Sequence, residues 1–275
     1  SIVVLTGCMP QAFPEISEKL DEADIVIGNK SNRFLFDYIN QYINNSGRIV
    51  AVDEHKTGDA FVGDCISNFR ERTRASVKIE DGCNRFCSYC VIPYLRGRSR
   101  SRSVESAAEE ILSSTAMETV VTGIDISDYR DEQGRDLTDL MLAVKDANTR
   151  IRLGSMEVSL ITERFLNALK QVKNFAPQFH LSLQSGSNNV LKSMNRHYTR
   201  EEYLEKCRMI YEAFENAAIT TDIIVGFPTE TEEDFLQSVQ IVEEAGFSQI
   251  HAFPYSPREG TNAFKKYKEL PVGVK

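Results

Sequence analysis

Three closely spaced cysteines are the residues of this sequence best suited to chemistry. Cys83, Cys87 and Cys90 follow a short β-like run and are spaced C-x-x-x-C-x-x-C. Sulfur is a soft ligand suited to iron, so three thiolates can hold three irons of a four-iron, four-sulfur cluster and leave the fourth iron open to a substrate or cofactor. The alternative is structural zinc, which needs four ligands. The nearest further candidates are Cys65 on the upstream side and His180 far downstream.

Length and composition predict a globular protein without membrane segments. The 275 residues are 41% hydrophobic and 26% charged, and no apolar run reaches the length of a membrane span. The six cysteines and the lack of an export signal predict reduced thiols in the cytoplasm. The net charge of −8 argues against a general attraction to nucleic acid, and neither DNA nor a membrane is an expected partner.

One local cluster of arginines departs from this acidic balance. Arginines precede, interrupt and follow the three cysteines, at Arg70, Arg72, Arg74, Arg85, Arg96, Arg98, Arg100 and Arg102. A charge run of this kind is usually a solvated loop. Because the cluster adjoins a reactive centre, contact of Arg96, Arg98 and Arg100 with an RNA substrate is the alternative interpretation.

Residues 1–50 have the pattern of part of a doubly wound α/β domain. Strands and helices are expected in alternation near 2–5, 14–20, 23–28 and 32–43. About 45 residues bury too little surface to fold alone, so we expect residue 1 to lie inside a longer protein. Cys8 follows the first strand, where α/β domains place ligands, although a buried structural thiol is the alternative. Residues 51–74 are expected to be a linker.

From residue 75 to 275 the apolar runs predict alternating strands and helices. The expected strands are near 76–80, 118–122, 149–155, 178–184, 218–225 and 248–254. The expected helices are near 103–113, 135–147, 161–172, 199–215 and 230–245. Thr199 with Glu202, and Thr229 with Glu232, fit capping boxes at two helix starts. Six such units predict a parallel sheet curled into a partial TIM-type (β/α)6 barrel, with an open doubly wound sheet as the alternative.

The C-terminal ends of these strands carry residues suited to a bound nucleoside. In parallel α/β barrels the active site lies at these ends. Gly123 and Gly226 would let ligand polar groups approach backbone amides, and Ser155, Glu157 and Gln184 could bond hydroxyls and an amino group. Aromatic faces for a flat base are offered by Tyr89 and Phe253. Turn chemistry is the alternative for each residue alone.

The motif Cys83-x-x-x-Cys87-x-Tyr89-Cys90 on a first strand–helix loop resembles the radical S-adenosylmethionine (SAM) superfamily. The resemblance implies a four-iron, four-sulfur cluster on the three cysteines, with the amino-acid end of SAM on the fourth iron. Reductive cleavage of SAM then gives a 5′-deoxyadenosyl radical, chemistry that belongs to the cofactor. The residues implied in cofactor binding are Phe86, Tyr89, Thr122, Gly123, Ser155, Glu157, Gln184, Gly226 and Phe253.

Longer motifs are similar to those of the methylthiotransferases within that superfamily. They are the stretches 80–98, 183–186, 222–231 and 253–256, together with Thr6-Gly7-Cys8 and Gln11. Within the family, the stretches 122–129, 194–199 and 254–261 are most like the branch that modifies N6-threonylcarbamoyladenosine in tRNA. Asp125 and Arg196, which lie in these stretches, are further candidates for substrate or RNA contact.

The family resemblance implies a two-stage reaction. One SAM methylates a sulfur on an auxiliary four-iron, four-sulfur cluster, to which Cys8 would contribute, and another supplies the radical that acts on carbon two of the adenine at tRNA position 37. The implied partners are tRNA and an electron donor such as flavodoxin or ferredoxin. Two further auxiliary cysteines would precede residue 1. The alternatives are isopentenyladenosine in tRNA or a ribosomal-protein aspartate as substrate, or a zinc-stabilised RNA-binding module without catalysis.

Overall fold

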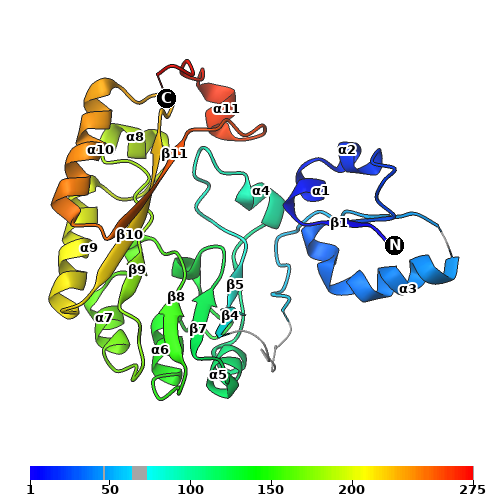
Figure 1. Cartoon of the computed structure of the whole chain (residues 1–275), viewed down its shortest axis with the longest axis horizontal. Coiled ribbons are helices and arrows are strands. Elements are labelled where there is room, and N and C mark those ends of the chain that lie inside the picture. The colour runs from blue at the N-terminus through cyan, green and yellow to red at the C-terminus, as the bar shows by residue number, and fades with distance from the viewer. Residues whose placement is uncertain (46, 64–72, 275) are drawn as a thin grey trace.

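The computed structural model describes residues 1–45, 47–63 and 73–274. Figure 1 shows a small N-terminal domain beside a larger α/β domain, which begins at strand β4. Cys65, Arg70 and Arg72 lie outside the described residues. Within these residues, no helix is both long and apolar enough to cross a bilayer.

The N-terminal domain is built on a three-stranded parallel sheet in the order β1-β2-β3. The strands are β1 (Val4–Thr6), β2 (Ile25–Ile27) and β3 (Ile49–Ala51). The helical segments are α1 (Cys8–Ala12), α2 (Pro14–Glu18), the 3-10 segment η1 (Asn29–Phe34) and α3 (Leu35–Asn45). All three side chains of β2 are fully buried, which fits its central place in the sheet. Strand β3 ends at Ala51, so the sheet extends one residue into the region 51–74 that was expected to be a linker.

The larger domain alternates strands and helices as predicted, with shorter elements. Its parallel strands are β4 (Arg74–Lys78), β7 (Glu118–Thr122), β8 (Arg150–Leu153), β9 (Gln178–His180), β10 (Ala218–Val225) and β11 (Gln249–Pro254). The intervening long helices are α5 (Val104–Ser113), α6 (Leu137–Ala143), α7 (Glu163–Leu169), α9 (Arg200–Ala213) and α10 (Glu232–Ala245). Figure 1 shows these helices along one side of the strands. Short helical segments are α4 (Ile92–Arg96), η2 (Ile126–Asp128), η3 (Val158–Leu160), α8 (Asn188–Ser193) and α11 (Asn262–Lys266).

The six strands form two three-stranded parallel sheets rather than one regular six-stranded sheet. The orders are β4-β7-β8 and β9-β10-β11. Beyond the end of β8, the Met156 amide donates to the His180 carbonyl at 2.9 Å, and the Ser182 amide donates to the Met156 carbonyl at 3.2 Å. These two bonds join the two sheets, because they link the chain just beyond β8 to the chain at the end of β9. The structure therefore confirms an α/β fold with parallel strands, while closure into a barrel stays a prediction.

A buried apolar layer holds the strands against the helices. It includes Val77, Val121, Ile151, Phe179, Ile219, Ile111, Leu140, Phe165 and Ile210. Burying an aliphatic or aromatic side chain of this size contributes about 1.5–3 kcal/mol each. This layer lies on the helix side of the strands, so the polar ends of the strands stay available for a site.

One helix start differs from the prediction. The capping box Thr199–Glu202 of α9 is confirmed. At α10 the box is formed by Thr231 and Asp234, so the prediction of Thr229 with Glu232 is wrong. The cause lies in the preceding turn, where the Glu230 carboxylate accepts from the Gly226 amide at 2.6 Å. That turn uses two more residues before the helix can begin.

Candidate functional site

The three cysteines lie in a loop that is closed by a hairpin, which the sequence pattern did not predict. A short antiparallel hairpin, β5 (Glu80–Asp81) with β6 (Arg100–Ser101), holds both ends of the segment 82–99. We call this segment the cysteine loop. At its start Gly82 has a φ of +87°, and a Cβ there would lie 2.1 Å from the Arg98 carbonyl oxygen. Only glycine fits where the two ends of the loop pass so closely.

Cys83, Cys87 and Cys90 line one cavity of about 170 Å³. All three are half-buried free thiols. Burial raises the pKa of Cys83 to about 12 and also raises the pKa of Cys90. Metal binding requires thiolates, so a bound metal would have to displace these protons.

The donor set of this cavity fits an iron–sulfur cluster with one open iron. Three cysteines line this cavity, and the other residues that line it include no fourth cysteine and no histidine. His180, the distant zinc candidate, is instead hydrogen-bonded to Thr220 at 2.9 Å and lies 3.1 Å from Asp222. Structural zinc uses four protein ligands, so three sulfurs without a fourth partner favour the cluster.

Two arginines and two carboxylates surround the sulfurs. Arg85 pairs with Asp125 at 2.7 Å and with Glu157 at 2.6 Å. Arg196 lies 3.5 Å from Glu157 and donates to the Cys87 sulfur at 3.3 Å. Burial works against the charge of both arginines, but Asp125 and Glu157 raise the pKa of Arg85, and the surrounding tyrosines, Cys87 and Glu157 raise the pKa of Arg196, so both stay charged. The network can orient charged ligand groups and counter the negative charge of a thiolate-bound cluster.

Four predicted cofactor residues lie in the wall of this cavity. They are Tyr89, Ser155, Glu157 and Gln184. Tyr89 and Gln184 also line a neighbouring cavity of about 310 Å³, together with Phe253. Gln184 has a φ of +71°, which is uncommon for a residue with a side chain and marks the boundary between the two cavities.

The other predicted cofactor residues do not line the cysteine cavity. Phe86 packs edge-on against Tyr94 at 5.7 Å. Thr122 ends β7, and its carbonyl accepts from the Ile79 amide. The Gly226 amide is occupied by Glu230. Their roles in cofactor binding stay predictions.

Gly123 fits closely against a buried glutamate that the sequence did not indicate. A Cβ on Gly123 would lie 2.9 Å from Glu80 Oε2. The same oxygen accepts from the Ile124 amide at 2.9 Å and the Asp125 amide at 2.8 Å. Burial raises the pKa of Glu80 to about 8, so at neutral pH the carboxyl is mainly protonated. This contact fixes the turn that carries Asp125.

The segment that follows α8 also holds the cysteine loop in place. The Asn195 side chain donates to the carbonyls of Phe86 at 3.0 Å and Arg85 at 3.3 Å. The Ser88 amide donates to the Met194 carbonyl at 2.9 Å. Asn195 has a φ of +58°, a conformation that asparagine tolerates better than most residues. The segment after α8 therefore positions the loop as well as delivering Arg196.

Cys8 lies apart from the other three cysteines, at the start of α1. It lines a cavity of about 780 Å³ with residues of the cysteine loop, including Val91 and Tyr94, and with Arg258. Arg96 Nη2 lies 3.6 Å from its sulfur. The structure thus places Cys8 at the contact between the two domains, not among Cys83, Cys87 and Cys90.

The arginines expected to contact RNA lie in different surroundings. Arg96 and Arg100 both pair with Asp81, at 3.2 and 2.9 Å. Arg98 is exposed and stacks over the Phe86 ring at 4.4 Å. Asp125 and Arg196 belong to the network around the cysteine cavity. RNA contact by these five residues stays a prediction.

Sequence reasoning named Arg85 only as one of the clustered arginines, and it assigned Glu80 no role in the site. Arg85 stands inside the cysteine motif and could have been suspected from that position. Glu80 has no such signal, since only the fold brings it to the Ile124 and Asp125 amides. The Asn195 clamp likewise joins positions more than 100 residues apart in the chain, with separations of 110 and 109.

Comparisons with known proteins show which family the chain resembles. The Radical SAM superfamily profile matches residues 77–242. Threonylcarbamoyladenosine tRNA methylthiotransferase MtaB of Aquifex aeolicus (strain VF5) is 38% identical across 100% of this chain, and the match covers 68% of that protein. The protein of the same name from Bacillus subtilis (strain 168) is 35% identical across 100% of this chain and 62% of its own length. The tRNA-2-methylthio-N(6)-dimethylallyladenosine synthase of Alkaliphilus oremlandii (strain OhILAs) is 35% identical, with 100% and 60% covered.

Solved structures share the fold. The cobalamin-dependent S-adenosylmethionine radical enzyme OxsB, with aqua-cobalamin and S-adenosylmethionine bound, has a TM-score of 0.62 at 14% identity, covering 96% of this chain and 41% of that one. The radical S-adenosylmethionine methyltransferase TsrM from Kitasatospora setae has a TM-score of 0.58 at 17% identity, covering 69% and 38%. Identities this low show the fold alone.

The chain belongs to the radical SAM superfamily and, within it, to the methylthiotransferase family. It spans between 60% and 68% of the length of the three relatives named above.

Proposed function

We propose that this protein transfers a methylthio group to carbon two of N6-threonylcarbamoyladenosine in the anticodon loop of tRNA. SAM would serve as both radical source and methyl donor, with cytoplasmic tRNA as substrate and a flavodoxin or ferredoxin as electron donor. When bound at Cys83, Cys87 and Cys90, a four-iron, four-sulfur cluster with SAM supplies a 5′-deoxyadenosyl radical that can abstract hydrogen. An auxiliary cluster would use Cys8.

The observation that carries the proposal is the order of three neighbouring cavities. The cysteine cavity shares Tyr89 and Gln184 with the 310 Å³ cavity. That middle cavity shares Arg258 with the cavity of Cys8. An adenosine bound in the middle would therefore have the radical source on one side and the sulfur source on the other, the arrangement that methylthio transfer needs.

The residues of the middle cavity suit a modified adenosine. Tyr89 and Phe253 offer aromatic surface for a base, and Gln184 offers a donor and an acceptor for its polar edge. Arg258 adds a cation that could pair with the carboxylate of a threonylcarbamoyl group. In the cysteine cavity, Arg85 and Arg196 hold Asp125 and Glu157 in place for the amino-acid end and ribose of SAM.

A second candidate substrate is N6-dimethylallyladenosine. The relative from Alkaliphilus oremlandii carries that name and is nearly as similar as the threonylcarbamoyladenosine enzymes. A dimethylallyl group has no carboxylate and would leave Arg258 without an anionic partner. Nucleoside analysis of tRNA from a deletion strain separates the two, because only one modified adenosine would lose its methylthio group.

Three cysteine substitutions test the proposal in the complete natural polypeptide, reconstituted anaerobically with iron and sulfide. Cys87→Ser is expected to abolish both 5′-deoxyadenosine formation and methylthio transfer. Cys8→Ser is expected to keep 5′-deoxyadenosine formation and lose methylthio transfer. Cys207→Ala, which alters a buried thiol in α9, is the matched control and should keep both. Methylthio transfer by the Cys8→Ser protein, or no SAM cleavage by the unmodified protein, would refute the proposal.

A further inference from the structure

A strongly basic cavity lies between the two domains, outside the three cavities described above. Its volume is about 410 Å³. Five cations line it, from η1 of the N-terminal domain and from the strand ends and cysteine loop of the larger domain. They are Lys30, Arg33, Lys78, Arg96 and Arg100.

The carboxylates of this cavity do not balance its cations. Asp81 alone accepts from Lys78 at 2.7 Å, Arg96 at 3.2 Å and Arg100 at 2.9 Å. Asp59 pairs with Lys30 at 3.0 Å. Two carboxylates thus face five cations, an excess of three positive charges in a chain whose net charge is −8.

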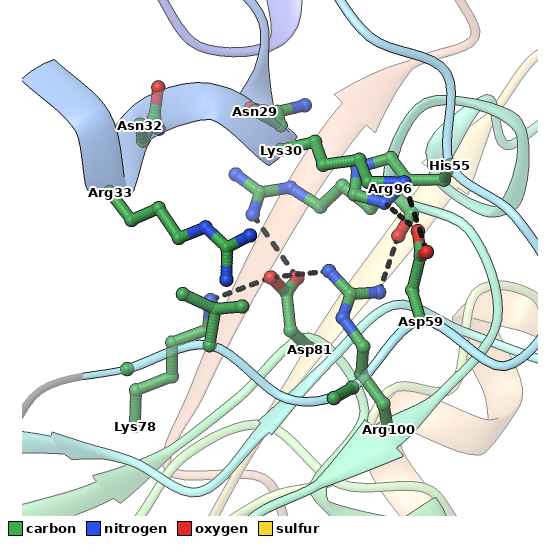
Figure 2. Close-up of a pocket in the computed structure, with 13 residues that line it drawn as sticks. Asn29, Lys30, Asn32, Arg33, His55, Asp59, Lys78, Asp81, Arg96 and Arg100 are labelled. Carbon is green, nitrogen blue, oxygen red and sulfur yellow. Dashed lines mark hydrogen bonds and ion pairs between the residues drawn. The ribbon is translucent and has the colours of Figure 1, made fainter.

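Figure 2 shows how these side chains are arranged. The heads of Lys78, Arg96 and Arg100 surround Asp81, joined to it by dashed lines. The Arg33 guanidinium points toward the same space, and no dashed line joins it to the other residues drawn. The cavity therefore holds more cations than ion pairing between the two domains requires.

Two buried nitrogens among the residues that line this cavity lack a hydrogen-bond partner within the described residues. Arg96 Nε is buried and has no hydrogen-bond partner among the described residues. The His55 side chain is only 5% exposed, and within the same described residues its Nε2 has no partner. Buried polar atoms without partners are uncommon and indicate a missing ligand or water. An oxyanion carries several acceptor atoms, and the planar arginine fork matches phosphate geometry.

We propose that this cavity binds a backbone phosphate of the RNA substrate, an inference that rests on the proposed function. Arg96 reaches both Asp81 in this cavity and the sulfur of Cys8 in the next one. A polynucleotide can place a phosphate here and a base among the neighbouring cavities within one molecule, which a free phosphate cannot. The phosphate would also contact both domains at once, because Lys30 and Arg33 come from one and Lys78 and Arg100 from the other.

The test measures binding of an anticodon stem-loop RNA over a range of salt concentrations. Arg33→Ala is the main variant, because Arg33 is exposed and its loss leaves the Asp81 ion pairs intact. Lys30→Ala is the second variant. Lys170→Ala removes one exposed cation at the end of α7 and is the matched control. We expect each cavity variant to bind about tenfold more weakly, with a salt slope shallower by about one, and the control to bind like the unmodified protein.

The outcomes separate this inference from the proposed function. If the unmodified protein binds the RNA and both cavity variants match it in affinity and salt slope, the cavity is not a phosphate site and the inference fails. Inorganic pyrophosphate is the second probe, and its binding is measured as thermal stabilisation of the protein. If pyrophosphate stabilises the protein in an Arg33-dependent way and the RNA does not compete with it, the ligand is a free phosphate and the RNA assignment fails. The formation of 5′-deoxyadenosine, measured on the same variants without RNA, reports on the radical site independently and should not change.

Discussion

Glu80 offers the sharpest test of how the fold builds the site. Its Oε2 accepts from the Ile124 and Asp125 amides, and Ser99 bonds its other oxygen at 3.2 Å. Glu80→Ala leaves two buried amide donors without an acceptor, each worth about 1–3 kcal/mol. We therefore expect the free energy of unfolding to fall by about 2–6 kcal/mol. Glu80→Gln keeps an acceptor oxygen and the shape, so it should cost less than about 1 kcal/mol near neutral pH.

The same residue predicts a pH dependence of known sign. The pKa of Glu80 is raised by burial to about 8 in the folded protein, against an ordinary value of 4.5 for a glutamate in water. Between these values the folded state keeps a proton that the unfolded state has released, so the stability from this group is full below pH 4.5 and falls as pH rises toward 8. Glu80→Gln removes this effect. The glutamine protein should therefore gain stability relative to the unmodified protein as pH rises.

Urea unfolding followed by circular dichroism at several pH values, with all variants in the same state of iron loading, measures both effects. A Glu80→Ala protein within about 0.5 kcal/mol of the unmodified one would show that the two amides do not depend on Glu80. A stability difference between the glutamine variant and the unmodified protein that stays constant with pH would show that Glu80 ionises normally. Either result would contradict the burial argument.

Three further changes have expected outcomes. Gly82→Ala should cost well over 2 kcal/mol in unfolding experiments, whereas Gly134→Ala, at a φ of +80° with nothing near its Cβ, should cost only about 1 kcal/mol; equal costs would contradict the close approach at Gly82. Asn195→Ala should lower iron retention measured by metal analysis, with Asn195→Gly as the variant that keeps the positive φ and loses only the side-chain bonds to the cysteine loop; unchanged retention in both would rule out the clamp. The pKa of Asp222 is lowered, first by its hydrogen bond with His180, so its stabilising effect is present above its unfolded pKa and lost as pH falls through the folded value. Asp222→Asn should thus destabilise the protein at neutral pH and progressively less in acid, as measured by unfolding across that range; a difference that grows in acid would reverse the assigned sign.

The regular part of the fold could be predicted from local sequence pattern. Strands such as β7 and β10 are rich in Val, Ile and Thr and alternate buried with partly buried positions, and helix starts such as Thr199 carry their own capping signal. The placement of Cys83, Cys87 and Cys90 around one cavity also follows from their local spacing. Each of these features depends on residues close together in the chain, which is why periodicity and motif reasoning reach them.

The electrostatic network could not be predicted, because it joins residues far apart. Arg85 meets Asp125 across 40 positions, and Arg196 meets Cys87 across 109. Such pairs depend on strand register and on loop paths, which composition and spacing do not specify. The hairpin of β5 and β6 was missed for a related reason, since two paired residues on each side are too few to produce an alternating pattern.

Gln184 shows why departures from local rules coincide with the site. Its left-handed backbone costs roughly 1–2 kcal/mol for a residue with a side chain. Strand β10 holds it there, because the Gln184 amide donates to Asp222 at 2.8 Å and the Ile224 amide donates to Gln184 at 2.9 Å. Glycine would avoid the strain but would remove the side chain that lines both the cysteine cavity and the middle cavity. A strained glutamine at the boundary of two cavities is therefore better explained by ligand binding than by folding alone.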